Sequence, residues 1–322
     1  MSEPPDELDW IAALRPLTRG ATAALGLLDD AAVLPGRPGF DLVISEDAMV
    51  EGVHFPEGEP ARVVARRLLR TSLSDLAAKA AEPFGYTLAI AWPASRGWEE
   101  RMAFIRGLDE DGARFGVELL GGDTVSTPGP LTASASVLGW APAGEVVRRS
   151  GALAGHALVV CGTIGDGYLG LKAARGELAD PEGRLAERYR LPEPLFGLRG
   201  ALRAHAAAAA DVSDGLIADA LHIAEASRCG LTLDLGRMPM SDAARAWVAG
   251  RQDRAGALLE LASGGDDYAI VCAAQDGEAL ARDAAALGTP AAVVGAFVAP
   301  PGLAVSLDAR PLSPTRTGWR HG

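Results

Sequence analysis

Apolar residues recur at two spacings along the chain, and these spacings separate expected helices from expected strands. Helical spacing predicts helices over 8–17, 61–81, 98–115 and 277–287, with others after Gly167, from about Glu193 and from Gly215. Short apolar runs or alternation predict strands over 42–44, 86–92, 117–120, 131–140, 157–161, 231–235, 268–272 and 292–298. The alanines 206–210 read as the end of a helix. Because helices and strands do not alternate strictly, the pattern favours an α+β (mixed α/β) fold over a doubly wound parallel sheet.

The pattern restarts after the Pro/Gly-containing stretch 141–144, which predicts two α/β domains, 1–145 and 146–322. A chain of 322 residues is long enough for two such domains. The strand expected over 131–140 is compatible with a sheet edge that pairs with a partner.

Composition excludes several classes of function. A net charge of −12 argues against broad contact with nucleic acid, which requires a basic patch. No apolar run reaches the roughly 18 residues of a membrane span, and the acidic N-terminus lacks the pattern of a signal peptide. Cys161, Cys229 and Cys272 are far apart, so neither a zinc site nor a disulfide framework is indicated. We therefore expect a cytoplasmic protein without a membrane or nucleic-acid partner.

Aspartates cluster beside apolar, strand-like runs at five places, which are Leu27–Asp30, Leu42–Asp47, Val117–Asp123, Ala210–Asp214 and Ser263–Asp267. One such stretch alone is adequately explained as a turn, because Asp and Gly are default turn residues. Five in one chain favour convergence, and converging carboxylates repel one another unless a cation lies among them. Oxygen ligands without clustered Cys or His indicate Mg²⁺ or Mn²⁺.

For four further sites in the sequence, a structural and a functional interpretation both stay open. Asp75 lies inside an expected helix and is either solvent-facing or functional. Ser213 or Asp214 is placed to cap the helix from Gly215, where free N–H groups also bind anions. Arg149 belongs to a solvated charge pair or to a phosphate clamp, and His54 is a core residue or a ligand.

Familiar nucleotide-binding motifs are missing. The chain has no Gly-x-x-x-x-Gly-Lys-Ser/Thr loop, and the glycine cluster 162–167 lacks the lysine of such a loop and only partly imitates a dinucleotide fingerprint. Lys79 and Lys172 are the only lysines among 30 basic residues. If this chain handles polyphosphate, metals and arginines must neutralise it.

Taken in order, the motifs resemble those of the thiamine-monophosphate kinases. They are Asp29-Asp-Ala-Ala-Val33, Asp47-Ala-Met-Val-Glu-Gly-Val-His-Phe55, Ser72-Leu-Ser-Asp-Leu-Ala-Ala78, Gly121-Gly-Asp-Thr124, Arg149-Ser-Gly151, Asp211-Val-Ser-Asp-Gly-Leu216 and Gly264-Gly-Asp-Asp-Tyr268. The resemblance runs from about residue 26 to Trp319. It implies ATP-dependent phosphorylation of thiamine monophosphate to thiamine diphosphate with several Mg²⁺ ions. It also implies the two-domain fold of aminoimidazole ribonucleotide synthetase, with the N-terminal sheet pairing across a homodimer.

The resemblance assigns roles position by position. The implied metal ligands, direct or through water, are Asp30, Ser45, Glu46, Asp47, Asp75, Asp123, Asp211 and Asp214. The implied ATP contacts are Gly122, Asp123, Arg149 and Ser213. The implied contacts to thiamine monophosphate are His54, Asp266 and Trp319, whose indole offers a stacking face. No side chain is expected to act as a dedicated acid or base.

Three positions depart from the family pattern. Leu28 replaces a flexible glycine, Glu46 replaces a threonine beside a presumed metal, and Asp266 replaces a glutamate at a substrate contact. These departures leave open a catalytically impaired nucleotide-binding homologue. Another ATP-dependent enzyme of the same superfamily is the second alternative, although its selenophosphate synthetase and hydrogenase-maturation branches carry cysteines that this chain lacks near its ends. The number of metals, the choice of Mg²⁺ or Mn²⁺ and any monovalent ion are not fixed by the sequence.

Overall fold

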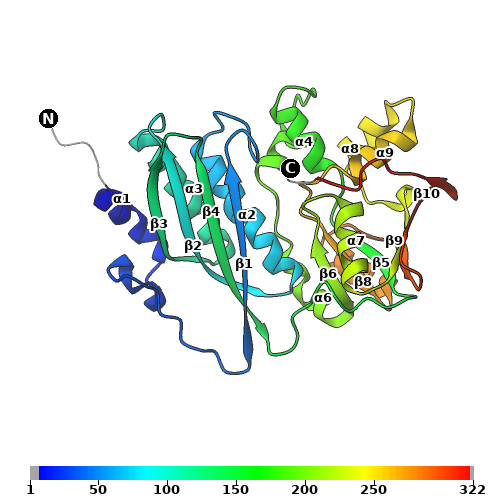
Figure 1. Ribbon diagram of the computed structural model, residues 1–322, viewed down its shortest axis with the longest axis horizontal. Helices are drawn as coiled ribbons and strands as arrows, with labels where there is room; N and C mark the ends of the chain where they lie inside the picture. The colour runs from blue at the N-terminus through cyan, green and yellow to red at the C-terminus, as the bar shows by residue number, and fades with distance from the viewer. Residues whose placement is uncertain (1–6, 320–322) are drawn as a thin grey trace. The chain divides into compact units, whose positions relative to one another are not determined.

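A computed structural model describes residues 7–319, and its main chain folds into two compact units (Figure 1). The N-terminal unit runs to Leu76 and continues from Ala81 to Gly144. The C-terminal unit contains Ala77–Ala80 and the chain from Glu145 onwards. Within residues 7–319, none of the helices combines the length and the hydropathy of a membrane span.

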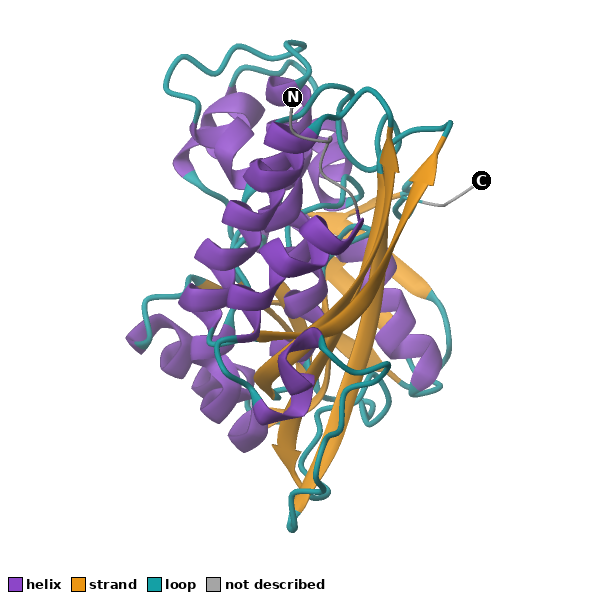
Figure 2. Ribbon diagram, turned by 90° about the vertical axis from the view of Figure 1, so that its left-hand side faces the viewer, coloured by secondary structure: helices purple, strands orange, loops and turns teal. Residues whose placement is uncertain are grey.

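The N-terminal unit is a sheet with helices along one face, as Figure 2 shows for its long strands. Its elements in chain order are α1 (Glu7–Leu14), the 3-10 helices η1 (Arg15–Thr18) and η2 (Thr22–Leu27), β1 (Phe40–Val50), α2 (Ala61–Ala78), β2 (Glu82–Pro93), α3 (Trp98–Phe115), β3 (Glu118–Thr127) and β4 (Thr132–Pro142). Apolar residues such as Leu68, Leu73 and Phe104 are fully buried on the covered face. Burial of these helix stripes is the main force that holds α2 and α3 on the sheet.

The strands of this unit lie in the order β1-β4-β2-β3. β4 pairs antiparallel with both β1 and β2, and β3 pairs parallel with β2. The expectation that the strand over 131–140 could be an edge is therefore wrong, because neighbours occupy both of its sides. The edges of this sheet are β1 and β3.

The second face of this sheet carries exposed apolar side chains. Leu42 and Ile44 of β1 are 40% and 61% exposed, and Val125 of β3 is 52% exposed. They alternate with inward-facing neighbours, as the period of two in a strand requires. We call this surface, which Leu42, Ile44 and Val125 define, the open face.

The C-terminal unit is built on a seven-stranded sheet in the order β11-β10-β7-β9-β5-β8-β6. Its strands are β5 (Ala157–Cys161), β6 (Ala206–Asp211), β7 (Gly230–Asp234), β8 (Ile270–Ala274), β9 (Ala291–Val298), β10 (Leu303–Leu307) and β11 (Arg310–Leu312). Its helices are α4 (Asp166–Ala174), α5 (Arg184–Arg190), η3 (Phe196–Leu198), α6 (Arg199–His205), α7 (Leu216–Ala226), η4 (Leu235–Arg237), α8 (Asp242–Ala249), α9 (Arg254–Ala262) and α10 (Gly277–Ala286).

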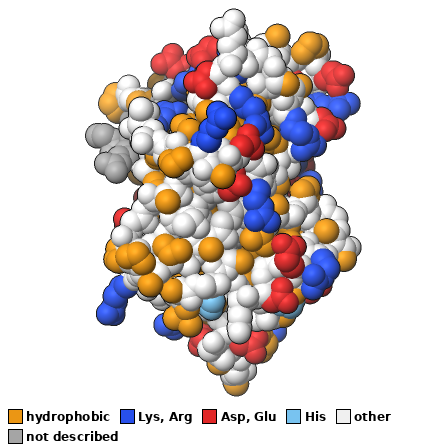
Figure 3. All heavy atoms as spheres, turned by 90° about the vertical axis from the view of Figure 1, so that its right-hand side faces the viewer, with side chains coloured by type: hydrophobic (Ala, Val, Ile, Leu, Met, Phe, Trp, Pro, Cys, Tyr) orange, Lys and Arg blue, Asp and Glu red, His pale blue; other side chains and the backbone are white. Residues whose placement is uncertain are grey.

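Both faces of this second sheet are buried. Alternate residues of β5 enter two separate apolar clusters, with Leu158 and Val160 in one and Val159 and Cys161 in the other. A strand buried on both sides reads as a continuous apolar run, which is why 157–161 was predicted with correct bounds. The outer surface drawn in Figure 3 mixes acidic and basic side chains. Exposed ion pairs of this unit include Arg254 with Asp308 and Arg245 with Asp242.

Two predicted elements were wrong. The alanines 206–210 form strand β6, which pairs with β8. Alanine favours helices in isolation, but its small side chain also fits a strand packed between two apolar layers, and tertiary pairing decides the outcome. The helix expected from about Glu193 begins only at Arg199, after the 3-10 turn η3. Pro192 and Pro194 disfavour helix in the residues that precede them.

Candidate active site

The predicted acidic residues lie inside strands and not after them. β1 extends to Val50 and β3 extends to Thr127, so Asp47 and Asp123 are strand residues. The expectation that both strands stop before these aspartates was wrong, because polar residues are common in edge strands with one covered face. The consequence is that neighbouring side chains point to opposite faces of the sheet.

Ser45 and Asp47 of β1 point to the face that α2 covers. Ser45 Oγ donates a hydrogen bond to Asp75 Oδ2 of α2 at 2.5 Å. The hydroxyl of Ser72, one turn before Asp75, donates to Leu68 O at 2.9 Å and lies near enough to Asp47 to lower its pKa. β1 and α2 therefore place two carboxylates and two hydroxyls together, which we call the inner acid cluster. Ser72 was absent from the predicted site, although its i, i+3 spacing to Asp75 was a usable signal.

The inner acid cluster carries uncompensated negative charge. Burial, repulsion by Asp75 and the charge of Glu46 together raise the pKa of Asp47 to about 6, and the nearby Ser72 hydroxyl partly opposes this rise. Carboxylates that share a site without a cation behave in this way. The donor atoms are hard oxygens, the kind that Mg²⁺ and Mn²⁺ prefer. The residues of this cluster therefore fit the predicted divalent ion.

Glu46 and Asp123 lie on the open face, opposite to Asp47. The register aligns Ala48 with Ser134, Ser134 with Ala89, and Ala89 with Asp123. Aligned residues share a face, so Asp123 shares the face of Ala48 and Glu46, and Glu46 accepts a hydrogen bond from Ser134 Oγ at 2.7 Å. Three strand spacings, about 14 Å, separate β1 from β3. The N-terminal unit alone thus does not bring Asp123 or Glu46 to the inner acid cluster.

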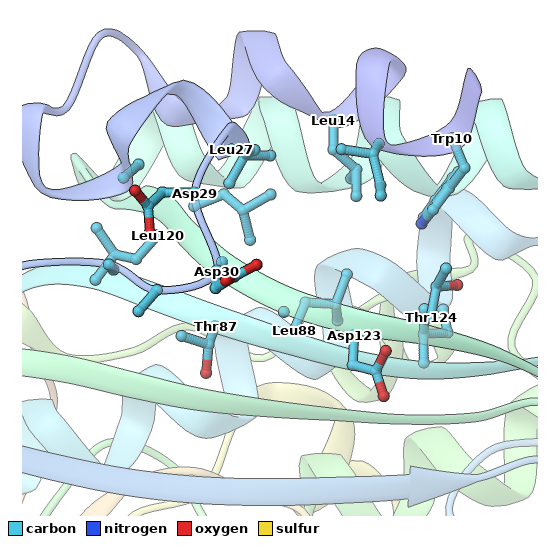
Figure 4. Close-up of a pocket in the computed structure, with 18 of the residues that line it drawn as sticks. Trp10, Leu14, Leu27, Asp29, Asp30, Thr87, Leu88, Leu120, Asp123 and Thr124 are labelled. Carbon is cyan, nitrogen blue, oxygen red and sulfur yellow. The ribbon is translucent and has the colours of Figure 1, made fainter. Parts of the chain in front are cut away.

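Asp30 and Asp123 line a cavity of about 370 Å³ at the β3 edge of the sheet. Its walls are Trp10, Ile11 and Leu14 of α1, Leu27 and the segment 29–32, and residues of β2 and β3 that include Gly121 and Gly122. Figure 4 shows Leu88 and Thr124 pointing towards Trp10, and Thr87 and Asp123 pointing to the other side of the sheet. The cavity therefore combines an apolar, aromatic wall with aspartate and glycine residues at its rim, while the carboxylate of Asp123 points away from that wall.

Gly122 and Leu28 show why this rim tolerates its sequence. A side chain on Gly122 would place its Cβ 2.0 Å from the carbonyl oxygen of Leu88, so only glycine fits there. Leu28 adopts an ordinary backbone conformation with a φ of −115°, whereas the positive φ values fall on Leu25, Gly26 and Leu27. The replacement of glycine by Leu28 therefore causes no backbone strain at that position.

His54 lies in the loop after β1. Its Nδ1 accepts a hydrogen bond from the backbone N–H of Val50 at 3.0 Å. Because Nδ1 is the acceptor, the ring proton of the neutral imidazole is on Nε2. The structure thus presents His54 as an Nε2–H donor, the form that a phosphate oxygen accepts.

In the C-terminal unit, the loop 212–215 lies between the loop 264–268 and the chain around Trp319. Asp266 N donates to Ser213 O at 2.8 Å, and Trp319 N donates to Asp214 O at 2.9 Å. A Cβ on Gly265, which has a φ of +80°, would lie 2.6 Å from Ser213 O. Asp266 itself adopts a φ of 63°, unusual for a residue with a side chain. The predicted residues Ser213, Asp214, Asp266 and Trp319 therefore form one group, next to Asp211 at the end of β6.

The cap of helix α7 differs from the prediction. Neither Ser213 nor Asp214 caps it with a side chain. Instead, Asp219 Oδ2 accepts hydrogen bonds from Asp214 N at 3.0 Å and Gly215 N at 3.2 Å. An acid in the first turn can satisfy free N–H groups by reaching back in this way. Asp219 is 1% exposed and holds the loop that carries two predicted site residues, Ser213 and Asp214.

His222 adds a ligand type that the prediction did not include. Its Nδ1 lies 3.4 Å from Asp219 Oδ1, and this neighbour raises the pKa of His222. Possible ligand atoms of Asp214, Asp219 and His222 all lie within 4.8 Å of one another, a spacing that could hold a metal ion. The charge of Arg149 acts on His222 as well, which places the predicted phosphate clamp beside this group. The i, i+3 spacing of Asp219 and His222 was the sequence signal for it.

The glycine cluster 162–167 is occupied by the protein itself. Asp267 Oδ2 accepts from Gly165 N and Asp267 Oδ1 accepts from Gly167 N, both at 2.8 Å. Burial raises the pKa of Asp267 to about 7, against these two hydrogen bonds. These two N–H groups, which a dinucleotide phosphate would need, bind Asp267 instead. This loop therefore supports the loop 264–268 and is not a second nucleotide site.

Comparison with protein families matches both halves of the chain. The AIR synthase related protein N-terminal domain matches residues 28–141, and the AIR synthase related protein C-terminal domain matches residues 154–308. The fold is also similar to the hydrogenase maturation protein HypE of E. coli, with a TM-score of 0.75 at 20% identity over 96% of this chain and 97% of that one. It is similar to AaThiL, solved with AMPPCP and TMP, with a TM-score of 0.77 at 22% identity over 98% and 97% of the two chains. At these identities the likeness supports the fold alone.

More similar relatives separate the branches of this group. The chain is 56% identical to the thiamine-monophosphate kinase of Caulobacter vibrioides over 322 residues, which cover 99% of this chain and 92% of the relative. It is 36% identical to that of Escherichia coli K12, covering 92% and 91%. The solved thiamine-monophosphate kinase of Stenotrophomonas maltophilia matches with a TM-score of 0.81 at 33% identity over 94% and 96%. With the acidic clusters already described, these similarities mean that the chain belongs to the thiamine-monophosphate kinase family of the AIR synthase related proteins.

Proposed function

We propose that this chain transfers the γ-phosphoryl group of ATP to thiamine monophosphate, forming thiamine diphosphate and ADP. The observation that carries the proposal is the 56% identity to the Caulobacter kinase over 99% of the chain. The inner acid cluster and the group around Ser213 and Asp266 supply residue types suited to this reaction. We propose the cytoplasm as its location.

The reaction needs positioning and charge neutralisation and no general base. A terminal oxygen of the thiamine monophosphate phosphate forms a bond to the γ-phosphorus, and the bond from that phosphorus to the β–γ bridging oxygen breaks as ADP leaves. The attacking oxygen is already an anion, so no proton has to be removed. In such transfers, catalysis comes mainly from alignment and electrostatic stabilisation.

We assign the divalent ions, Mg²⁺ with Mn²⁺ as a substitute, to acidic residues of both units. When bound, such ions offset the charge of the phosphates and align their oxygens. The strongest assignments in the N-terminal unit are Ser45 and Asp75, which are hydrogen-bonded, and Asp47, whose charge interacts with Asp75. The strongest in the C-terminal unit is Asp214, which lies beside Asp219 and His222. The remaining assignments are Asp30, Glu46, Asp123 and Asp211.

Within the N-terminal unit, we assign nucleotide binding to the cavity at the β3 edge. Within the C-terminal unit, we assign contacts with ATP to Arg149 and Ser213. A nucleobase suits an apolar wall with an aromatic member such as Trp10, and phosphates can approach the backbone closely at Gly122. Arg149 is placed to neutralise phosphate charge, since a guanidinium binds two phosphate oxygens at once. For the second substrate, His54 donates from Nε2 to the phosphate, and Asp266 and Trp319 contact the thiamine part.

We further propose that the open face associates with the same face of a second copy. Exposed Leu42, Ile44 and Val125 on a sheet face without a covering helix leave apolar area in water. Exposed apolar side chains on a sheet face suit a protein interface. Association through this face would also cover Glu46 and Asp123, which share it.

A coupled assay of ADP release tests the function directly. We expect release that depends on both thiamine monophosphate and Mg²⁺, with thiamine diphosphate formed in equal amount to ADP. Free thiamine, in place of the monophosphate, serves as the control acceptor. ATP binding without turnover that depends on thiamine monophosphate would instead support the alternative of a silent nucleotide-binding homologue. The unstrained backbone at Leu28 removes one reason for that alternative.

A further inference from the structure

The loop that carries His54 is closed by its own backbone. Gly52 N donates to Phe55 O at 2.8 Å, and His54 N donates to Val50 O at 2.9 Å. With the Val50 N–H bond to Nδ1, these contacts fix both the position of the imidazole and the nitrogen that carries its proton. The geometry of His54 therefore depends on how the ends of this loop are held.

Glu51 ties the two ends of the loop together. Its Oε1 accepts from Gly58 N at 2.9 Å, and its Oε2 accepts from Leu131 N at 3.3 Å. Its own N–H donates to Leu131 O at 2.9 Å, which joins the loop to the residue before β4. The side chain is 14% exposed. One carboxylate thus closes the loop and attaches it to the sheet.

Arg96 holds Glu51 from the other side. It lies between β2 and α3, and its Nη2 donates to Glu51 Oε1 at 2.6 Å. Its Nη1 donates to Glu100 Oε2 at 2.8 Å and to the backbone oxygen of Glu59 at 3.0 Å, just beyond the loop. The Arg96 side chain is 9% exposed. The guanidinium therefore contacts the start of the loop at Glu51 and its end at Glu59.

We propose that the Glu51–Arg96 ion pair is a positioning device for His54, which sets the affinity of the kinase for thiamine monophosphate. The proposal rests on the proposed function, in which His54 contacts the substrate phosphate. Glu51 lies three residues before His54 and its bonds go to the loop ends, so its effect on substrate passes through the loop. Within residues 7–319, the side-chain hydrogen bonds of the pair go to Gly58, Glu59, Glu100 and Leu131, none of which is assigned to ATP. We therefore expect the pair to affect thiamine monophosphate and not ATP.

The hydrogen-bond partners of Glu51 agree with a supporting role for this residue. In the stretch Val50-Glu-Gly-Val-His-Phe55, Glu51 accepts hydrogen bonds from Gly58, Arg96 and Leu131, and His54 Nδ1 accepts one from Val50. Burying an ion pair at a loop is expensive in desolvation unless its hydrogen bonds are satisfied. Here both partners have several bonds, which suits a rigid support for a binding loop.

A double-mutant cycle between Glu51→Ala and His54→Ala tests the proposal. Steady-state KM and kcat are measured for thiamine monophosphate and, separately, for ATP. We expect Glu51→Ala to lower kcat/KM for thiamine monophosphate about tenfold to a hundredfold, as small misplacements of binding groups do. The KM for ATP should change less than about twofold. The double variant should be no worse than His54→Ala, because a residue that acts only through His54 has no effect once His54 is gone.

Two conservative variants and one control complete the test. Glu51→Gln retains one acceptor oxygen for a backbone N–H and should recover part of the loss. Arg96→Met should resemble Glu51→Ala. These two variants carry the test if Glu51→Ala does not fold. Arg62→Ala removes an exposed ion pair to Glu110 and should leave both KM values unchanged. The positioning role would be overturned if the losses of the two single variants multiplied in the double variant. It would also be overturned if Glu51→Ala changed the kinetics of ATP as much as those of thiamine monophosphate. If His54→Ala alone leaves thiamine monophosphate kinetics unchanged, the assignment of His54 is wrong as well. If His54→Ala lowers kcat/KM for thiamine monophosphate but Glu51→Ala does not, only the positioning role of Glu51 is refuted.

Discussion

The inner acid cluster predicts that Asp47→Asn stabilises the metal-free protein at neutral pH while abolishing its activity. The pKa of Asp47 is raised from 3.8 to about 6 in the folded chain. Each pKa unit corresponds to about 1.4 kcal/mol, so ionising Asp47 costs the fold about 3 kcal/mol, or about 2 kcal/mol when its partial exposure is considered. Because the folded state holds this proton more tightly, the cost is absent below pH 4, develops between pH 4 and 6, and is complete at pH 7. Asparagine retains a polar group for Ser72 without the charge.

Urea unfolding in EDTA at pH 4.5 and pH 7.5 measures this effect. The stability gain of Asp47→Asn over the unmodified chain should be about 2 to 3 kcal/mol at pH 7.5 and should be smaller at pH 4.5. Added Mg²⁺ should stabilise the unmodified chain more than the variant, since the variant lacks part of the site. Glu99→Gln, an exposed acid on α3 of the same unit, is the control and should change stability by less than about 0.5 kcal/mol. A gain that is independent of pH would show that the carboxylates of the inner cluster do not repel as described.

Three further predictions follow from features of the two units. Asp123→Asn should reduce kcat by orders of magnitude at matched Mg²⁺, because it removes a proposed metal and nucleotide contact; near-normal turnover would remove Asp123 from the site. Ile44→Asp, on the open face, should convert an associated species to one of single-chain mass in light scattering, and an unchanged mass would show that this face is not the interface. Iodoacetamide at pH 8 should label half-buried Cys229 before the fully buried Cys161 and Cys272. The hydrogen bond with Cys161, together with burial, also raises the pKa of Cys272. Peptide mass mapping of the native protein measures the order of labelling, and the opposite order would contradict the prediction.

The elements with a clear apolar pattern could be predicted from the sequence. The helix over 98–115 and the strand over 157–161 have the predicted bounds, because one shows a clear helical stripe and the other a strand buried on both faces. The stretch 206–210 could not be predicted in the same way, since five alanines fit a helix or a buried strand and only the pairing with β8 decides between them.

The site was predicted at the level of residue type and less well at the level of geometry. The acidic motifs predicted that Asp47 and Asp75 converge, and the structure places the two side chains near each other, while their role as metal ligands stays a prediction. They did not reveal that Asp47 and Asp123 belong to opposite faces of one sheet, because that depends on where β1 and β3 end. Asp219, which holds the 212–215 loop through backbone N–H groups, was missed because its role is visible only once that loop is folded.

The alternation along β1 has a consequence for how this protein can evolve. Ser45 and Asp47 serve the acid cluster while Ile44 and Glu46, their direct neighbours, face outward. Inserting or deleting one residue in this strand would exchange the inward-facing and outward-facing side chains at once. Apolar side chains would then lie among the carboxylates of the cluster, and charged side chains would lie on the apolar open face. Natural variants of β1 should therefore differ by replacement, and length changes should accumulate in the turns that flank it.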